Sequence, residues 1–153
     1  MKKVKYLIVL ILFFFVKQSA AQELNTLIDS KSTAIQNQLT QWRRHLHQHP
    51  ELGNREFKTS AYIIDQLKDL GLEIKTGIAK TGVVAILKGG KPGPVIALRA
   101  DIDALPVKER VNIPYASTDS GMYGNVKVPV MHACGHDAHV AMLIGTAKVL
   151  SSM

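Results

Sequence analysis

Cysteine is nearly absent from this sequence, because Cys134 is the only one among its 153 residues. No disulfide can form within the chain, and a C-x-x-C redox pair is excluded. Long apolar runs are also lacking, since the stretch from Tyr6 to Val16 has 11 residues. A helix needs about 20 residues to cross a bilayer, so this stretch is too short for a comfortable span.

The sequence also lacks internal repeats, low-complexity segments and long basic tracts after residue 21. The formal net charge of +7 includes four lysines within residues 1–21, and without these four it falls to +3. Charges in the remainder are interleaved, and no basic block exceeds the Arg43–Arg44 pair. This pattern gives little support to nucleic-acid binding, and we expect no nucleic-acid partner.

Residues 1–21 have the composition of a secretory signal peptide. Three lysines precede the apolar stretch, and small residues at Ser19 and Ala21 lie just before a cut preceding Gln22. An uncleaved membrane anchor is the alternative, whereas the lack of a cysteine after the cut argues against a lipoprotein. We therefore expect an exported protein, periplasmic or secreted, with no stable membrane insertion after cleavage. The mature chain, residues 22–153, is long enough for one modest core.

The spacing of apolar residues predicts three helices. A period near 3.6 residues runs from Leu24 to about His47 and again from about Arg55 to Leu70. A final helix should begin near Asp137, which is a good N-cap residue.

Short apolar segments between these helices predict strands at Leu72–Thr76, Val83–Leu87 and Val95–Leu98. Residues 104–132 carry three prolines and two glycines, so we expect them to be irregular. The order of elements predicts an α/β sandwich, of which this chain holds only a part.

The only cysteine lies in a segment rich in histidine, MHACGHDAH at residues 131–139. Cys134 and His136 are two positions apart, and Gly135 lets the backbone turn between them. Thiolate and imidazole are good ligands for zinc and related ions, and a following helix N-terminus would help to keep the thiol ionised. His132 and His139 are alternatively surface or supporting groups, and we favour that interpretation for His139.

Two carboxylates lie in a second segment, LRADIDALPV. Asp101 and Asp103 follow an apolar strand and, because side chains alternate along a strand, they would point to the same side. Two facing carboxylates repel each other unless a cation offsets them, and a metal ion or Arg99 could supply it. The alternative is that both acids cap turns around Pro106.

Three alternating histidines lie in a third segment, RRHLHQHPELGNREF. On a helix His45 and His49 share a face, so a second metal site is one interpretation. Histidines of this kind are more often solvated or hydrogen-bonded to nearby carboxylates, and we favour a structural role for His45, His47 and His49. Glu51 and Glu56 are the carboxylates closest in sequence.

These segments, in this order, resemble the N-terminal part of the metal-dependent aminoacylase and carboxypeptidase superfamily. The nearest branch contains N-acyl-amino-acid amidohydrolases, hippurate hydrolases and auxin-conjugate hydrolases. The resemblance covers most of residues 38–150, and its most specific part is the Cys-x-His pair. The matching segments are RRHLHQHPELGNREF, KTGVVAILKG, ALRADIDALPV, IPYAS and MHACGHDAHVAMLIGTA.

The resemblance implies a partial three-layer α/β metallopeptidase-like catalytic domain, truncated before the lid domain and the rest of the sheet. It implies one or two divalent ions, zinc or manganese, with Cys134 and His136 as ligands. Asp103 resembles the carboxylate that orients a metal-site group, and Asp101 occupies a place where other branches have a histidine ligand. The other ligands and the general-base glutamate would lie beyond Met153.

The function that the resemblance implies is hydrolysis of the amide bond of an N-acyl amino acid or short peptide. Residues 1–153 alone are expected to be inactive, and a homodimer of the full-length enzyme stays an open expectation. Residues 117–130 form a longer link than the family pattern has, which could alter substrate choice or dimer contacts. The alternatives are a non-catalytic relative that binds metal or ligand, a redox protein that uses Cys134, and a purely structural export domain.

Overall fold

The computed structural model describes residues 21–153, so the predicted signal peptide lies outside the described residues except for Ala21. The chain divides into two compact units, residues 1–35 and residues 36–153. In the described part of the first unit, residues 21–34 form a helix on which Leu24 and Leu27 are exposed. Within residues 21–153, no helix combines the length and the apolar character that a membrane crossing requires.

The predicted helix from Leu24 to about His47 is interrupted at Ile35, which lies in a turn. The prediction of one continuous helix is therefore wrong. The segment before the turn carries Ser32 and Thr33, whose hydroxyl groups compete with helical backbone hydrogen bonds. The second part, α2 (Gln36–Gln48), begins the larger unit.

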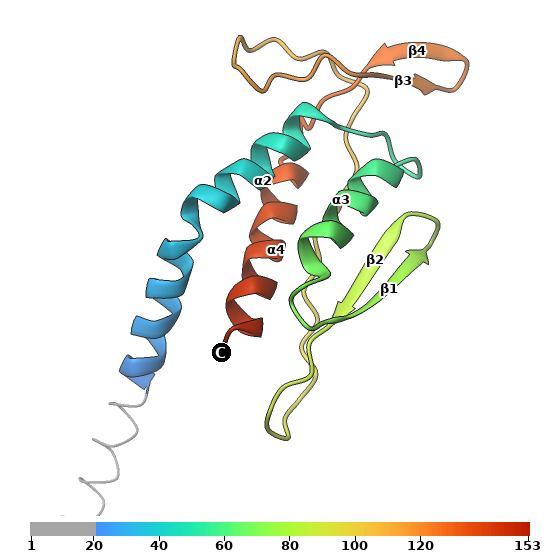
Figure 1. The fold of residues 1–153 in the computed structure, drawn as a ribbon. Coiled ribbons are helices and arrows are strands. Elements are labelled where there is room, and N and C mark those ends of the chain that lie inside the picture. Colours follow the sequence, from blue (N-terminus) through green and yellow to red (C-terminus); the bar gives the residue numbers. More distant parts are fainter. Residues whose placement is uncertain (1–20) are drawn as a thin grey trace, which may run out of the picture. The chain divides into compact units, whose positions relative to one another are not determined.

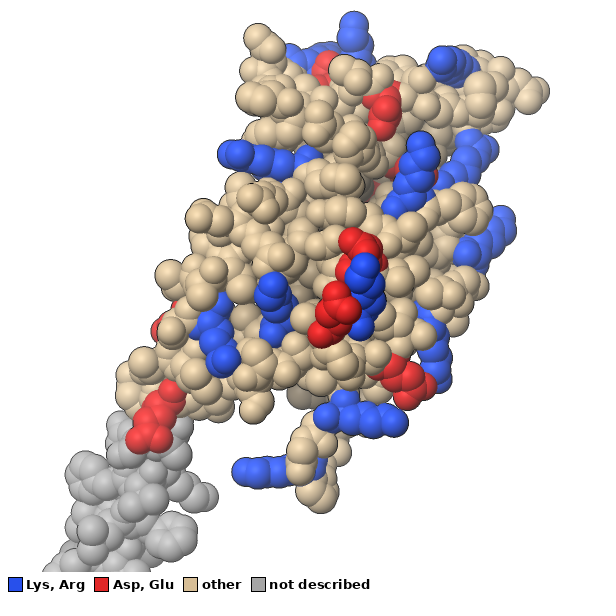
Figure 2. Space-filling model, in the orientation of Figure 1, with Lys and Arg blue, Asp and Glu red and all other residues tan. Residues whose placement is uncertain are grey.

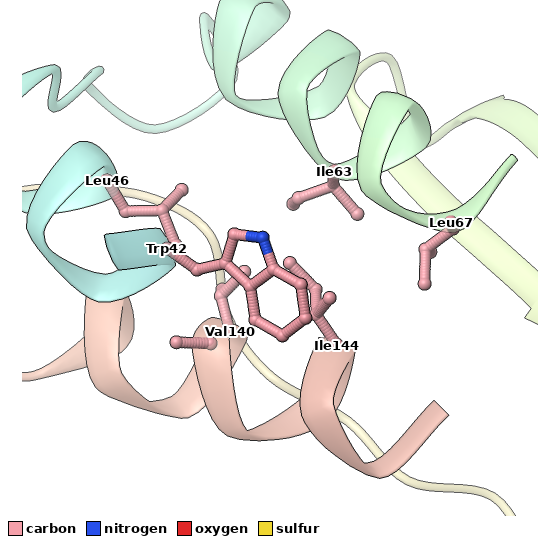
Figure 3. Packing of buried hydrophobic residues seen from close by; sticks show 7 residues of the cluster. Trp42, Leu46, Ile63, Leu67, Val140 and Ile144 are labelled. Carbon is pink, nitrogen blue, oxygen red and sulfur yellow. The ribbon is translucent and has the colours of Figure 1, made fainter. Parts of the chain in front are cut away.

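The core of the larger unit lies between three helices, α2, α3 (Phe57–Leu67) and α4 (His136–Ser151). Each helix contributes apolar residues four positions apart, which lie on one face because a helix turns every 3.6 residues. Figure 3 shows these side chains meeting around the indole of Trp42, whose Nε1 donates a 2.8 Å hydrogen bond to Gln66. The buried residues of this cluster are Trp42, Leu46, Ile63, Leu67, Val140, Ala141 and Ile144. All three predicted helical regions are thus present, with α4 beginning one residue before Asp137.

Two of the three predicted strands pair as an antiparallel hairpin beside α3 (Figure 1). β1 (Glu73–Ile78) and β2 (Gly82–Ile86) pair with Glu73 opposite Ile86 and Lys75 opposite Val84. Gly82 pairs with Ile78 at the end of the hairpin. Glycine is needed there, because a Cβ at this position would lie 2.6 Å from the carbonyl oxygen of Ile78. These strands confirm the predicted segments 72–76 and 83–87 to within a few residues.

The third predicted strand, Val95–Leu98, does not form. Val95 is 97% exposed and Ile96 80% exposed, and the segment belongs to neither of the described sheets. A strand needs a neighbour to satisfy its backbone N–H and C=O groups. Among the described residues β1 and β2 pair only with each other, so this segment has apolar strand character but no partner.

A second hairpin lies within residues 104–132, which were expected to be irregular. β3 (Ser120–Tyr123) and β4 (Val126–Pro129) pair antiparallel, joined by Gly124 at a φ of 59° and Asn125. A two-residue turn of this composition is a strong hairpin signal, so the prediction was wrong over residues 120–129. The hairpin occupies most of the long link at residues 117–130.

The base of this hairpin is anchored to the rest of the larger unit. Ser117 Oγ donates a 2.7 Å hydrogen bond to the carbonyl oxygen of Val130. Val130 also packs with Leu52 and Ala104 in a second small buried cluster. Helices with two small antiparallel sheets place the described chain in the predicted α/β class (Figure 1).

Charged side chains are distributed over several elements on the face shown in Figure 2. Lysines and arginines are scattered across this face and do not gather into one tract. Lys68 pairs with Asp65 at 2.5 Å, an exposed contact between side chains three residues apart. Such exposed pairs contribute little to stability, so the fold depends on the apolar cluster between the helices.

Candidate metal centre

The turn that carries Cys134 and His136 leads directly into α4. Gly135 between them has a φ of 80°, a left-handed conformation that favours glycine. Cys134 is exposed and makes no disulfide. Gly135 occupies the N-cap position and no side chain caps the helix, so the prediction that Asp137 caps it is wrong. Asp137 instead lies inside the first turn and points into the protein, where it is 1% exposed.

The ring of His136 contacts Asp103 through Nδ1. Its Nδ1 lies 2.9 Å from the carbonyl oxygen of Asp103 and 3.1 Å from Oδ1 of the same residue. A ring whose Nδ1 donates to a carboxylate keeps Nε2 free as a metal ligand, an arrangement common around bound metals. The structure therefore brings Asp103 and His136 together: the hydrogen bond is to the backbone carbonyl of Asp103, and its carboxylate lies beside the same ring nitrogen.

Asp101 has a different environment. Its Oδ1 lies 2.8 Å from Nη2 and 3.0 Å from Nε of Arg99, and the pair is exposed. Of the two alternatives that the sequence left open for offsetting this carboxylate, the structure shows pairing with Arg99. Among residues 21–153 no three His, Cys, Asp or Glu side chains are placed to hold one ion, so Asp101 does not complete a set with Cys134 and His136.

The side chains at this turn are of types that bind divalent metal ions. A closed metal site needs more ligands than these two. Thiolate and imidazole are ligands that zinc prefers. A second histidine lies close by in the sequence: His132 is 5% exposed, and neither of its ring nitrogens has a hydrogen-bond partner among the described residues. Burial lowers the pKa of His132 to about 4, so its ring is neutral near pH 7. A buried neutral imidazole without a partner indicates that a water molecule or another group completes this region.

A buried chain of charged side chains lies behind the first turn of α4. Asp137 Oδ2 accepts hydrogen bonds from Arg43 Nε at 3.0 Å and from His47 Nδ1 at 2.9 Å. His47 Nε2 lies 2.8 Å from Oε2 of Glu109, whose side chain is 5% exposed. These hydrogen-bonded side chains thus connect α2, the loop after Pro106 and α4.

Both carboxylates of this chain are stabilised in their ionised form. Burial raises the pKa of Asp137, but the hydrogen bond from His47 and the charge of Arg43 outweigh it, so the pKa lies below its ordinary value. Burial also raises the pKa of Glu109, yet the hydrogen bond from His47 and those from two backbone N–H groups bring the pKa below its ordinary value. Both side chains are therefore negative near pH 7.

The predicted structural role of the three histidines is confirmed for His47, but its carboxylate partners differ from those expected. Glu51 accepts hydrogen bonds from the backbone N–H and the hydroxyl of Thr59 at the start of α3. Glu56 accepts one from the Thr81 hydroxyl at 2.6 Å. Neither glutamate contacts His47, which reaches Asp137 and Glu109 instead.

His45 of α2 and His49, the residue after the end of α2, lie on the same side, as predicted. The rings of His45 and His49 lie 4.8 Å apart, and His45 stacks on Tyr62 with ring centroids 3.9 Å apart. Burial and the charge of His49 lower the pKa of His45. The described residues show no three-ligand metal group here, and this face is an aromatic contact between α2 and α3.

Sequence reasoning missed Arg43, whose side chain is partly exposed, and Glu109 as partners of the buried Asp137 and His47. Their partners are 94 and 62 residues away along the chain. Neither residue falls in a pattern that links it to a distant histidine or aspartate, so the sequence held no local signal for these pairs.

Comparison with known proteins identifies the family. A model described as peptidase family M20/M25/M40 matches residues 97–153. The N-acetyl-L-cysteine deacetylase of Bacillus subtilis strain 168 is 49% identical over 118 residues, which are 77% of this chain and 26% of that protein. The N-acyl-L-amino acid amidohydrolase of Geobacillus stearothermophilus is 43% identical over 132 residues, 86% of this chain and 32% of that protein. A solved dinuclear metal-binding peptidase of the M20 family from Bacillus subtilis is 45% identical, with a TM-score of 0.69, and the match covers 78% of this chain and 32% of that one.

The chain belongs to the M20 peptidase family. It spans about a quarter to a third of the length of these M20 relatives. The structural match confirms that the α/β fold is that of an M20 metallopeptidase domain. The four predicted site residues, Asp101, Asp103, Cys134 and His136, lie within the range 97–153 that the family model covers, and their roles stay predictions.

Proposed function

We propose that the full-length gene product is a metal-dependent amidohydrolase that cleaves the amide bond of N-acyl amino acids or short peptides. The observation that carries this proposal is the arrangement at the start of α4. Asp103 holds Nδ1 of His136, and Cys134 lies two residues earlier across a left-handed glycine. Two relatives support the same class, because the N-acetyl-L-cysteine deacetylase and the N-acyl-L-amino acid amidohydrolase both act on N-acyl amino acids.

In this proposal Cys134 and His136 hold a divalent cation, with Asp101 as a weaker candidate that would first have to leave Arg99. The cation, when bound, polarises the amide carbonyl and activates water for attack. Asp103 keeps the proton of His136 on Nδ1, so that Nε2 faces the ion. The thiolate of Cys134 favours zinc over magnesium, and we propose one or two ions of zinc or manganese. The general base and the remaining ligands are not among the residues assigned to this turn.

The test is a pair of substitutions in the full-length gene product, Cys134→Ser and His136→Gln. Each removes a proposed ligand, so we expect loss of bound metal and a fall in hydrolysis of N-acetyl amino acids of about 100-fold or more. Metal content is measured by elemental analysis and turnover by release of the free amino acid. The matched control is His139→Gln, because His139 is an exposed histidine on the same helix.

The outcomes separate the proposal from its alternative. Full metal content and unchanged turnover in Cys134→Ser would exclude this residue as a ligand. Metal binding without any turnover in the unsubstituted protein would favour a non-catalytic metal-binding relative.

We also propose that the protein is exported and acts as a homodimer. Export is supported by the composition of residues 1–21, and a mature N-terminus at Gln22 in the periplasmic or secreted fraction is the expected result. The dimer is supported by exposed apolar side chains on the β3–β4 hairpin, where Tyr123 is 63% and Val126 64% exposed. Sedimentation of the purified full-length protein tests the dimer, and a monomeric mass would contradict it.

A further inference from the structure

The buried chain behind the first turn of α4 has a feature that simple packing does not require. His47 lies between two carboxylates, with Nδ1 at 2.9 Å from Asp137 and Nε2 at 2.8 Å from Glu109. One ring nitrogen faces each carboxylate, so His47 bridges Asp137 and Glu109.

This arrangement is almost completely shielded from water. The side chains of His47, Asp137 and Glu109 are 6%, 1% and 5% exposed. Hydrogen bonds to carboxylates in such a setting are short and directional. Removing His47 would take this partner from Glu109, whereas Asp137 would keep only the bond from Arg43. The hydrogen bonds among these side chains therefore fix the position of Asp137 more firmly than apolar contacts would.

The position of Asp137 matters because it follows His136 directly. The turn before it contains Gly135, which allows a wide range of backbone conformations, and the exposed Cys134. Two contacts fix the residues that follow this turn. Asp103 contacts the ring of His136, and His47 contacts the side chain of the next residue, Asp137.

We propose that His47 is a positioning residue for the metal centre. By holding Asp137 between α2 and the loop that carries Glu109, it sets the first turn of α4 and so the directions of the Cys134 and His136 side chains. The metal centre itself is that of the proposed function. The contribution of His47 is additional to it, because His47 binds neither metal nor substrate.

The experiment compares His47→Gln with the unsubstituted full-length gene product. Zinc affinity is measured by competition with a chelator, starting from the metal-free protein. We expect His47→Gln to bind zinc about 10 to 100 times more weakly, the range typical for partners that orient ligands. At saturating zinc most of the hydrolytic rate should return, with KM close to that of the unsubstituted protein. A residue needed only for folding would not give a defect that zinc repairs.

The matched control is His45→Gln, two residues earlier on the same helix. His45 stacks on Tyr62 and faces neither carboxylate, so zinc affinity should stay unchanged. Because the two contacts of His47 act as one unit, the losses in His47→Gln and Asp137→Asn should not add in the double variant. Additive losses would contradict the proposal.

A milder variant covers the case in which His47→Gln does not fold. Glu109→Gln keeps the shape and one acceptor but removes a negative charge from His47, and we expect a weakening of zinc binding of about tenfold. Unchanged zinc affinity in whichever of the two variants folds overturns the positioning role. The proposed function fails separately, when Cys134→Ser keeps its metal and its turnover.

Discussion

At the scale of single residues, the candidate centre depends on one backbone conformation. Gly135 has a φ of 80° at the N-cap of α4, between Cys134 and His136, the first residue of that helix. A residue with a Cβ in the left-handed region costs roughly 1–2 kcal/mol. The glycine is therefore required by backbone geometry, since nothing lies within 4 Å of where its Cβ would be.

This conformation leads to a prediction for Gly135→Ala in the full-length gene product. The control is Gly93→Ala, at another glycine with open space but without a left-handed φ. Both substitutions reduce the freedom of the unfolded chain equally, so this effect cancels in the comparison. We expect Gly135→Ala to be less stable than Gly93→Ala by about 1–2 kcal/mol in urea denaturation. Equal midpoints for the two variants would show that the turn tolerates a side chain.

The same scale offers a test of the pKa of His45. Burial and the nearby charge of His49 lower this pKa, so less than the usual fraction of His45 is protonated near pH 6.5. In His49→Gln the repulsion disappears while burial stays, so we expect the pKa of His45 to rise part of the way to its ordinary value. An NMR titration of the ring protons measures it, with His139→Gln as a control that should leave His45 unchanged. A fall in the pKa of His45 would contradict the assigned cause.

At the scale of elements, local patterns were sufficient for the helices and for the first hairpin. α3 and α4 carry apolar residues four positions apart, while β1 contains Gly77 near its end and β2 begins at Gly82, so each signal lies within the element itself. Val95–Leu98 has the same local character as β2, yet it forms no strand, because pairing depends on a neighbour. The β3–β4 hairpin carried a usable turn signal at Gly124 and Asn125 that the surrounding prolines obscured.

The candidate site divides in the same way. The sequence indicated Cys134, His136 and Asp103, because ligand types and their spacing are local features or belong to the family resemblance. The contact between Asp103 and His136 spans 33 residues, and the contacts of His47 span 62 and 90. Residues so far apart in the sequence are brought together by tertiary packing, such as that of α2 against α4. No local sequence pattern records this packing.

At the scale of the whole molecule, the larger unit combines a buried apolar core between helices with apolar residues that are exposed elsewhere. The cluster between the three helices is buried, with Ala141 0% and Ile144 2% exposed. By contrast, Val95 and Ile96 are 97% and 80% exposed and belong to neither of the described sheets. Exposed adjacent apolar residues of this kind mark a surface that another element covers or that promotes association.

The metal chemistry of residues 22–153 expressed alone follows from the number of ligands. Catalytic zinc sites hold the ion with three protein ligands, whereas the described residues place only Cys134 and His136 at the turn, and no group of three is formed. We expect this polypeptide to hydrolyse no N-acyl amino acid and to bind zinc more weakly than the full-length gene product, as measured by chelator competition. The residual binding should disappear in Cys134→Ser, which separates specific from adventitious binding. Turnover by residues 22–153 alone would show that two ligands and the side chains around them are sufficient for catalysis.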